Sequence, residues 1–162
     1  LPLLNITQDD LDVALSRLNR WEQSKQGESL VEIRHAMQKI MQTDFGVFRT
    51  AKYMEEGLVK LKQLQERLKH AVLTDHSRVF NTARIEALEL DNLMEVAYAS
   101  AISALTREES RGAHSREDYP KRDDENWLKH LLYFSKADAI GFRPVNRNPM
   151  TVPPMELKDR SY

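Results

Sequence analysis

The side chains best suited to chemistry are concentrated in one charged stretch of the sequence. It runs from Arg107 to Pro120 as Arg-Glu-Glu-Ser-Arg-Gly-Ala-His-Ser-Arg-Glu-Asp-Tyr-Pro. Arginine forks pair with carboxylates through two parallel hydrogen bonds, so such a stretch can hold an irregular loop against another surface. Gly112 can supply a backbone conformation that a Cβ atom disfavours. A solvated loop is the ordinary interpretation of a charged run, but the interleaved Gly, His, Tyr and Pro residues favour an ordered docking loop whose partner lies partly outside this chain.

No arrangement of nucleophile, base or metal ligands accompanies this stretch. Ser110 and Ser115 lie close to His114, but no third group that would orient the histidine can be assigned, so a catalytic triad is not predicted. His70 and His76 do not share a helical face, which argues against metal binding by this pair. The sequence also lacks the glycine-rich motifs that cradle dinucleotides and nucleoside triphosphates. We therefore assign no catalytic, cofactor-binding or metal-binding residue in this chain.

Composition narrows the class of protein further. The 162 residues carry 24 Lys and Arg against 25 Asp and Glu, and this balance argues against binding to nucleic acid or to an anionic membrane surface. The absence of cysteine excludes disulfides, thiolate-bound zinc, cysteine-ligated iron–sulfur clusters and cysteine catalysis. No apolar run approaches the roughly 20 residues of a membrane-spanning helix, so direct membrane insertion is not expected.

The elements that must position the charged stretch are helical. Apolar spacing predicts helices over residues 7–27, 29–72 and 81–107, with a break in the second near Thr50. Thr7 with Asp10, and Ser29 with Glu32, resemble capping boxes at two helix starts. Three amphipathic helices with short connections indicate an antiparallel three-helix bundle over residues 1–107. The expected apolar positions include Leu11, Leu15, Leu18, Trp21, Ile33, Met37, Met41, Met54, Leu61, Leu90, Met94, Ala97 and Tyr98.

Residues 108–162 complete the same structural domain in this prediction. The charged docking loop comes first, and two short strands follow over residues 127–134 and 140–145. An extended tail, marked by four prolines from Pro144 onward, ends the chain. The predicted fold class is therefore mainly α, an antiparallel three-helix bundle followed by an irregular segment with short strands and a Pro-rich extended tail.

Two motifs carry a resemblance to a known family. ESRGAH, which begins at Glu109, and RDDxxWLKH, which begins at Arg122, resemble the C-terminal domain of the flavoprotein subunit of succinate dehydrogenase and fumarate reductase. FNTxR at Phe80 and the later LELDNLMEVAYA segment are also similar, and the latter favours the bacterial succinate dehydrogenase type. Fumarate reductase and L-aspartate oxidase, which shares a shorter form of the first motif, are the alternatives. The tail departs from the family pattern, in which Arg-x-Tyr follows the two adjacent prolines more closely.

The resemblance implies a spectrin-repeat-like bundle and a role in a larger enzyme. The parent subunit would be an oxidoreductase of electron transport and the tricarboxylic acid cycle that oxidises succinate to fumarate. Hydride would pass to a covalently held FAD, and electrons would continue to an iron–sulfur subunit and quinone. The flavin-linking histidine and the substrate-binding residues of the family lie upstream of this segment. This chain alone is therefore expected to be inactive, and Arg111 and Arg116 are not expected to clamp substrate.

The expected role of the chain is structural. Its partners would be the FAD-binding domain of the same parent chain, the iron–sulfur subunit and a flavinylation assembly factor. The complex would lie on the cytoplasmic side of the bacterial inner membrane, with this domain as a peripheral part. The competing hypothesis is a stand-alone helical protein-binding module with the loop as its ligand site. The residues expected at the interface or in its support are Arg107, Glu109, Ser110, Arg111, Gly112, His114, Arg116, Asp118, Arg122, Asp123, Trp127 and His130.

Overall fold

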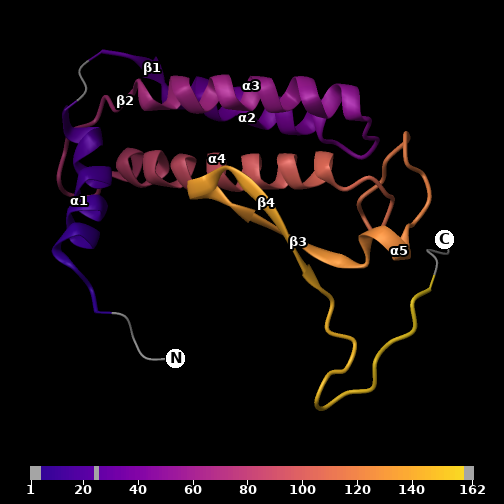
Figure 1. Ribbon diagram of the computed structural model, residues 1–162. Helices are drawn as coiled ribbons and strands as arrows, with labels where there is room; N and C mark the ends of the chain where they lie inside the picture. Colours follow the sequence, from indigo (N-terminus) through magenta and orange to yellow (C-terminus); the bar gives the residue numbers. More distant parts are fainter. Residues whose placement is uncertain (1–4, 24–25, 159–162) are drawn as a thin grey trace.

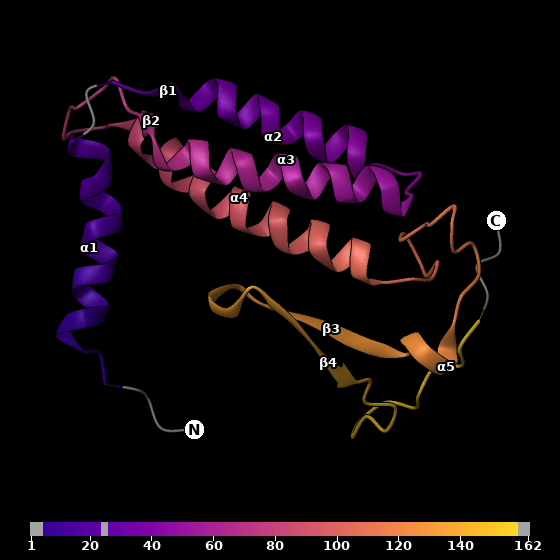
Figure 2. The ribbon, with the colours of Figure 1, turned by 45° about the horizontal axis from the view of Figure 1, so that its top comes forward.

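Three helices lie side by side and form the body of the domain (Figure 1). The computed structural model describes residues 5–23 and 26–158 of the chain. The bundle consists of α2 (Leu30–Asp44), α3 (Ala51–Lys69) and α4 (Thr82–Thr106), and successive helices run in opposite directions. A further helix, α1 (Gln8–Gln23), crosses the end of the bundle at which α4 begins (Figures 1 and 2). The predicted fold class is confirmed.

Capping interactions explain where the helices begin. Asn81 precedes α4, and its Oδ1 atom accepts a hydrogen bond from the Arg84 amide at 2.7 Å. Thr7 and Asp10 bond to each other's amides at 2.9 and 3.2 Å before α1, which confirms the first capping box. Ser29 precedes α2 but its side chain makes no capping hydrogen bond, so the second capping box is wrong.

The break predicted near Thr50 divides the second predicted helix into α2 and α3. Thr50 has extended backbone angles, φ −131° and ψ 154°, and directly precedes α3. The chain folds back tightly here because Gly57 has no side chain. A Cβ atom at that position would lie 2.5 Å from the ring of Phe45 at the end of α2. The break is confirmed, and it yields two of the three bundle helices.

The first helix lies elsewhere than predicted. Leu11, Leu15 and Leu18 are 47, 43 and 41% exposed, whereas Trp21 is fully buried. The reason is the break near Thr50. Once α2 and α3 fold back on each other, they complete the bundle with α4, and α1 is left across its end. The prediction that the first helix is a bundle member is therefore wrong.

The core lies between α2, α3 and α4. Three of the methionines predicted as core filling, Met37, Met54 and Met94, are buried, and Met41 packs against them half-buried. Such flexible side chains fill irregular gaps between helices. The other buried apolar residues are Trp21, Ile33, Phe45, Leu61, Leu64, Leu68, Ala71, Leu73, Ala87, Leu90, Ala97, Tyr98 and Ala101.

Two short strands join the start of α2 to the end of α3. β1 (Glu28–Ser29) pairs in parallel with β2 (Ala71–Val72). The Glu28 amide also donates to the carbonyl of His70 at 3.3 Å. A Cβ atom on Gly27 would lie 2.1 Å from that same carbonyl oxygen, so this approach requires glycine. The pair fixes one end of the α2–α3 hairpin.

A β-hairpin covers one side of α4. It comprises β3 (Lys129–Phe134) and β4 (Ala139–Pro144), joined by the 3₁₀-helix Ser135–Ala137. Tyr133 meets Tyr98 of α4 edge to face, with ring centres 5.8 Å apart. The second strand prediction is confirmed to within one residue at each end. The first is corrected, because Trp127 belongs to the short helix α5 (Asp124–Trp127), which Asp123 caps through the Asn126 amide at 2.9 Å.

The tail after β4 has no helix or strand up to residue 158, as predicted for this part of the chain. It returns toward α5, where Arg122 donates to the carbonyl of Lys158. Arg160 and Tyr162, on which the departure from the family pattern depends, lie outside the described residues.

Candidate functional site

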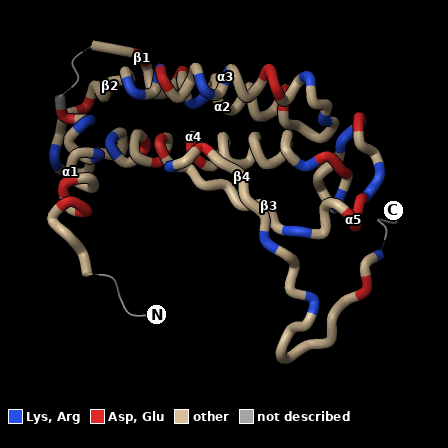
Figure 3. The backbone as a smooth tube through the Cα atoms, in the orientation of Figure 1, with Lys and Arg blue, Asp and Glu red and all other residues tan. Residues whose placement is uncertain are grey.

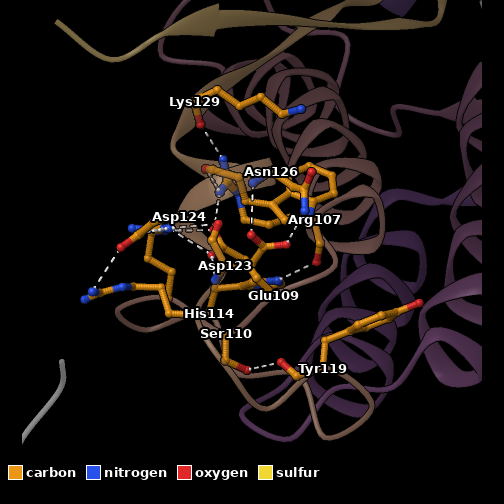
Figure 4. Close-up of polar contacts among 12 residues, drawn as sticks. Arg107, Glu109, Ser110, His114, Tyr119, Asp123, Asp124, Asn126 and Lys129 are labelled. Atoms are coloured by element: carbon orange, nitrogen blue, oxygen red, sulfur yellow. Dashed lines mark hydrogen bonds and ion pairs between the residues drawn. The ribbon is translucent and has the colours of Figure 1, made fainter. Parts of the chain in front are cut away.

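A fully buried carboxylate organises the loop that follows α4. Glu109 is 0% exposed, and both of its oxygens accept hydrogen bonds. Arg107 Nη1 and Arg111 Nε donate to Oε1, while Arg111 Nη2 and the Asp123 amide each reach Oε2 at 2.9 Å. Figure 4 shows the side chains of Arg107 and Glu109 pointing toward each other near Asp123. One carboxylate thus joins the end of α4 to the start of α5.

The surrounding donors keep this carboxylate charged. Burial alone would raise the pKa of Glu109, but hydrogen bonds from Arg111, the Asp123 amide and Arg107 outweigh it, and the pKa lies below its usual value. The hydrogen bond to Glu109 raises the pKa of Arg111, which also binds Asp124 at 2.6 Å. A buried charge is tolerated when it is paired and is costly when it is not. The shape of the loop therefore depends on keeping both arginines and the carboxylate.

A second ion pair, between a buried arginine and an exposed aspartate, connects the ends of two bundle helices. Arg116 is 1% exposed, and its Nε and Nη2 atoms each donate to Asp118 at 2.7 Å. Its Nη1 atom donates to the carbonyls of Leu105 and Arg107 at 2.9 and 3.1 Å, where α4 ends. Asp118 in turn accepts from the amide of Ala51, the first residue of α3, at 2.8 Å. The cation thus lies at a helix C-terminus and the anion at a helix N-terminus, which suits both helix dipoles.

This pair predicts how stability depends on pH. The hydrogen bond from Arg116 is the main reason that the pKa of Asp118 falls from 3.8 to about 2. Because the folded-state pKa is depressed, the resulting stabilisation is present above pH ~4 and is lost as the pH falls toward ~2. Asp118 is exposed, so solvent screening limits that stabilisation to about 1 kcal/mol. We expect the difference in free energy of unfolding between wild type and Asp118→Asn to shrink over that interval. Urea unfolding at several pH values measures it, and a constant difference would contradict the assignment.

A tight turn at Gly112 places His114 against the connection between α2 and α3. Arg111 and His114 exchange two backbone hydrogen bonds, and Gly112 between them has φ +58°, a left-handed conformation that favours glycine. His114 Nδ1 lies 2.8 Å from Arg49 Nη1, and Nε2 lies 3.1 Å from the carbonyl of Arg107. These partners assign Nδ1 as acceptor and Nε2 as donor. Burial, reinforced by the charge of Arg49, lowers the pKa of His114, so the ring is neutral at pH 7.

Ser110 and Arg107 form hydrogen bonds with the backbone of the residues that follow the turn at Gly112. The Ser110 hydroxyl donates to the carbonyl of Tyr119 at 2.8 Å. Arg107 donates to the carbonyls of Trp127 and Lys129 at 2.9 and 2.6 Å, and its guanidinium lies 5.4 Å from the centre of the Trp127 ring. These contacts bind the loop to α5 and to the first residue of β3.

Two of the predicted site residues lie at the margin of this network. Arg122 binds Asp124 at 3.0 Å and faces the tail through Lys158. His130 is exposed on β3, where it pairs in register with Arg143. The structure therefore brings the predicted residues between Arg107 and Asp123, together with Trp127, into one network, and leaves His130 outside it.

Arg49 and Asp124 belong to the network but were not among the predicted site residues. Arg49 is 65 positions from its partner His114, so no local motif could have joined them. It also donates to the carbonyls of Phe45 and Gly46, at 3.2 and 2.9 Å, where α2 ends. Asp124 lies within the RDDxxWLKH motif. It could have been predicted as a site residue, because nearby arginines of the sequence need carboxylate partners.

The ion pairs and hydrogen bonds of this loop can keep its backbone in one conformation, so that the loop offers a surface of fixed shape. Figure 3 shows both signs of charge close together in this loop and α5, and the ion pairs described above lie within the chain. Arg111 and Arg116, the two arginines that could otherwise bind a substrate carboxylate, are each bound to carboxylates of the chain itself. Over residues 5–23 and 26–158, no three His, Cys, Asp or Glu side chains are placed to hold a metal ion.

The positions of the glycines and the apolarity of the helices bear on cofactor binding and on membrane insertion. The five glycines are scattered at positions 27, 46, 57, 112 and 141, so none of the described strand-to-helix connections has the glycine-rich turn that cradles a dinucleotide. Of the helices that the structure describes, none has the length and apolarity required to cross a bilayer.

The fold and the loop define a helical domain followed by a loop that its own ion pairs hold in shape and by a β-hairpin. A family model described as "Fumarate reductase flavoprotein C-term" matches residues 34–162. The chain belongs to this family of flavoprotein C-terminal domains, and the resemblance found in the sequence is confirmed.

Individual relatives agree with this assignment. The succinate dehydrogenase flavoprotein subunit of Coxiella burnetii is 56% identical over 152 residues, which are 94% of this chain and 26% of that protein. The fumarate reductase flavoprotein subunit of Mycobacterium tuberculosis is 41% identical over 122 residues, or 74% of this chain and 21% of that protein. A solved structure of E. coli quinol fumarate reductase superimposes with a TM-score of 0.80 at 36% identity, over 94% of this chain and 27% of that one. The chain thus spans about a quarter of the length of these relatives.

Proposed function

We propose that this chain is the C-terminal helical domain of a succinate dehydrogenase flavoprotein subunit and that it acts as a brace. The parent subunit oxidises succinate to fumarate with covalently bound FAD, and electrons pass to an iron–sulfur subunit and then to quinone. The FAD and the substrate are held by the preceding part of the parent chain. Residues 1–107 and 108–162 function as one structural domain, whose loop supports the contacts with the FAD-binding domain and with the iron–sulfur subunit.

The observation that carries this proposal is the burial of Glu109 between two arginines within the chain itself. A loop whose shape is fixed before it meets a partner loses little conformational entropy on binding. Electron transfer requires the flavin and the first cluster to be held at a fixed separation, so a rigid docking segment has a direct functional value. The 56% identity to a succinate dehydrogenase flavoprotein subunit supports the choice of reaction.

The wider assignment follows from the same proposal. The domain is a peripheral part of a complex on the cytoplasmic side of the bacterial inner membrane, and a flavinylation assembly factor is a further partner. The match of residues 34–162 to a flavoprotein C-terminal family favours this interpretation over a stand-alone protein-binding module.

Arg111→Ala in the full-length enzyme tests the brace. Arg111 binds Glu109 and Asp124, so its loss leaves the buried carboxylate underpaired and loosens the loop. We expect a several-fold lower yield of flavoprotein that co-purifies with the iron–sulfur subunit, or a lower flavin content per subunit. Lys52→Ala, at an exposed position of α3, is the control and should leave both unchanged. Normal assembly and flavin content with collapsed turnover would instead make Arg111 catalytic and overturn the proposal.

A further inference from the structure

Phe80 has an unusual backbone conformation and an unusual exposure. Its φ is +52°, in the left-handed region that bulky side chains rarely adopt. Its side chain is 97% exposed, so no packing within the described structure compensates for the strain. Strained residues persist only where their surroundings hold them, and they are concentrated at sites of function.

The surroundings of Phe80 do hold it. The side-chain amide of Asn81 donates to the carbonyls of Asp75 and Ser77 at 2.8 and 2.9 Å, and its oxygen accepts from the start of α4. The Thr82 amide donates to the carbonyl of Phe80 itself at 3.0 Å. The loop between β2 and α4 is therefore fixed on both sides of Phe80. An aromatic ring on a rigid, outward-facing loop is suited to insertion into an apolar pocket of a partner.

The neighbouring helix α1 also exposes apolar side chains while its position is fixed. α1 is attached to α4 by polar contacts, with Arg17 bonded to Asn92 at 2.6 Å and Arg20 to Asp91 at 2.7 Å. Its leucine stripe is left partly uncovered, as described above. Trp21, at the C-terminal end of α1, is buried in the core, so the uncovered apolar side is the part of the stripe that contains Leu11, Leu15 and Leu18. A helix that is anchored at one end and leaves such an apolar side uncovered is expected where a further surface covers it.

The two features lie at one end of the molecule. Glu22, near the end of α1, binds Arg84, near the start of α4, at 2.9 Å. Figures 1 and 2 both show the loop that precedes α4 beside the C-terminal end of α1. The docking loop that contains Glu109 lies at the opposite end of the bundle (Figure 1). The domain thus carries two separate surfaces.

We propose that Phe80 and the leucine stripe of α1 form the surface on which the preceding part of the parent flavoprotein chain packs. This inference rests on the proposed function, because it requires that the chain be a domain of the longer flavoprotein. It adds a contact with the parent's own chain at the Phe80 end, separate from the contacts that the charged loop supports at the other end of the bundle.

The length of the relatives and the proposed connectivity select this occupant. The relatives are nearly four times as long as the aligned segment, so most of such a chain lies outside the structure and is available to cover this end. In the proposed parent chain, that preceding part is joined covalently to this domain on the side of α1, which gives it a high effective concentration at this surface. An aliphatic and aromatic surface suits such a permanent contact.

Site-specific photocross-linking in the full-length flavoprotein tests the proposal. A benzophenone analogue of phenylalanine is placed at position 80 and, as a control, at Val59, which is 57% exposed on α3. After irradiation, peptide mass spectrometry identifies the joined segments. We expect position 80 to cross-link within the same chain, to residues that precede this domain, at least tenfold more than position 59. Cross-links mainly to the iron–sulfur subunit or to a second copy, or equal yields at both positions, would overturn the proposal.

Phe80→Gly provides a second, independent test. Glycine relieves the left-handed strain, so the domain should remain folded and at least as stable. The full-length variant should nevertheless lose the domain contact, seen as several-fold faster proteolytic separation of the two parts than in Val59→Ala, a change that α3 tolerates, when equal folding is confirmed by circular dichroism. An unchanged cleavage rate would contradict the inference. Succinate oxidation by the wild-type enzyme tests the proposed function separately, since the cross-link can form whether or not that reaction occurs.

Discussion

Replacement of Glu109 by glutamine should destabilise the loop that follows α4 more than a change of one atom suggests. The amide has nearly the shape of the carboxylate but no charge, so Arg107 and Arg111 lose their shared counter-ion while they remain mostly buried. Removing one partner of a buried ion pair costs about 3–5 kcal/mol. We therefore expect a loss of about 3 kcal/mol in the free energy of unfolding of the loop. Hydrogen exchange of the Asp123 amide, which donates to Glu109, measures it directly.

The adjacent residue supplies a matched control for this change. Glu108 is exposed, so Glu108→Gln removes the same charge from the same segment without leaving a buried arginine unpaired. Its effect should be within about 0.5 kcal/mol, as is usual for a surface substitution. If the Asp123 amide exchanged at the same rate in both variants, the buried ion pairs would not be what holds the loop.

Loss of Arg116 should have the second large effect. Arg116→Met fills much of the same space but removes the donors to Asp118 and to the carbonyls that end α4. Those groups are then left without their partners, and we expect a loss of about 3 kcal/mol or more in the free energy of unfolding. Urea unfolding measures the change, with Lys121→Met at an exposed position as the control.

A double-mutant cycle separates the ion pair from the helix cap. If the pair acts as a unit, Arg116→Met and Asp118→Asn together should cost less than the sum of the two single changes, by about 1–3 kcal/mol. Strict additivity would show that Arg116 acts through the carbonyls of α4 alone. The cycle thus tests the direct link between the end of α4 and the start of α3.

The helices were largely predictable because their signals are local. Asn81, the capping box at Thr7 and the apolar repeats depend on residues three or four positions apart, and these determined where the helices begin. The place of α1 was not predictable in the same way. Leu11, Leu15 and Leu18 have the spacing of a buried stripe, and only the completed packing of α2, α3 and α4 shows that no room remains for them in the bundle.

In the candidate site, too, local features were predictable and contacts between distant residues were not. The types of its residues, interleaved arginines and carboxylates with one glycine, predicted an ordered loop. Their pairing was beyond the sequence where it crosses between elements. Asp118 binds the amide of Ala51, 67 positions away, and His114 binds Arg49, 65 positions away. Such contacts depend on the break near Thr50, which brings the α2–α3 connection to the end of α4.

The short pair of β1 and β2 gives the domain a property that its helices alone would lack. It joins Glu28 to Ala71, so the chain through α2 and α3 leaves and returns at one point and forms a closed loop. Holding the ends of such a loop together carries an entropic cost that rises only slowly with its length. Secreted proteins often meet that cost with a disulfide. This chain has no cysteine, and it achieves the closure with backbone hydrogen bonds whose strength does not depend on the redox state of the surroundings.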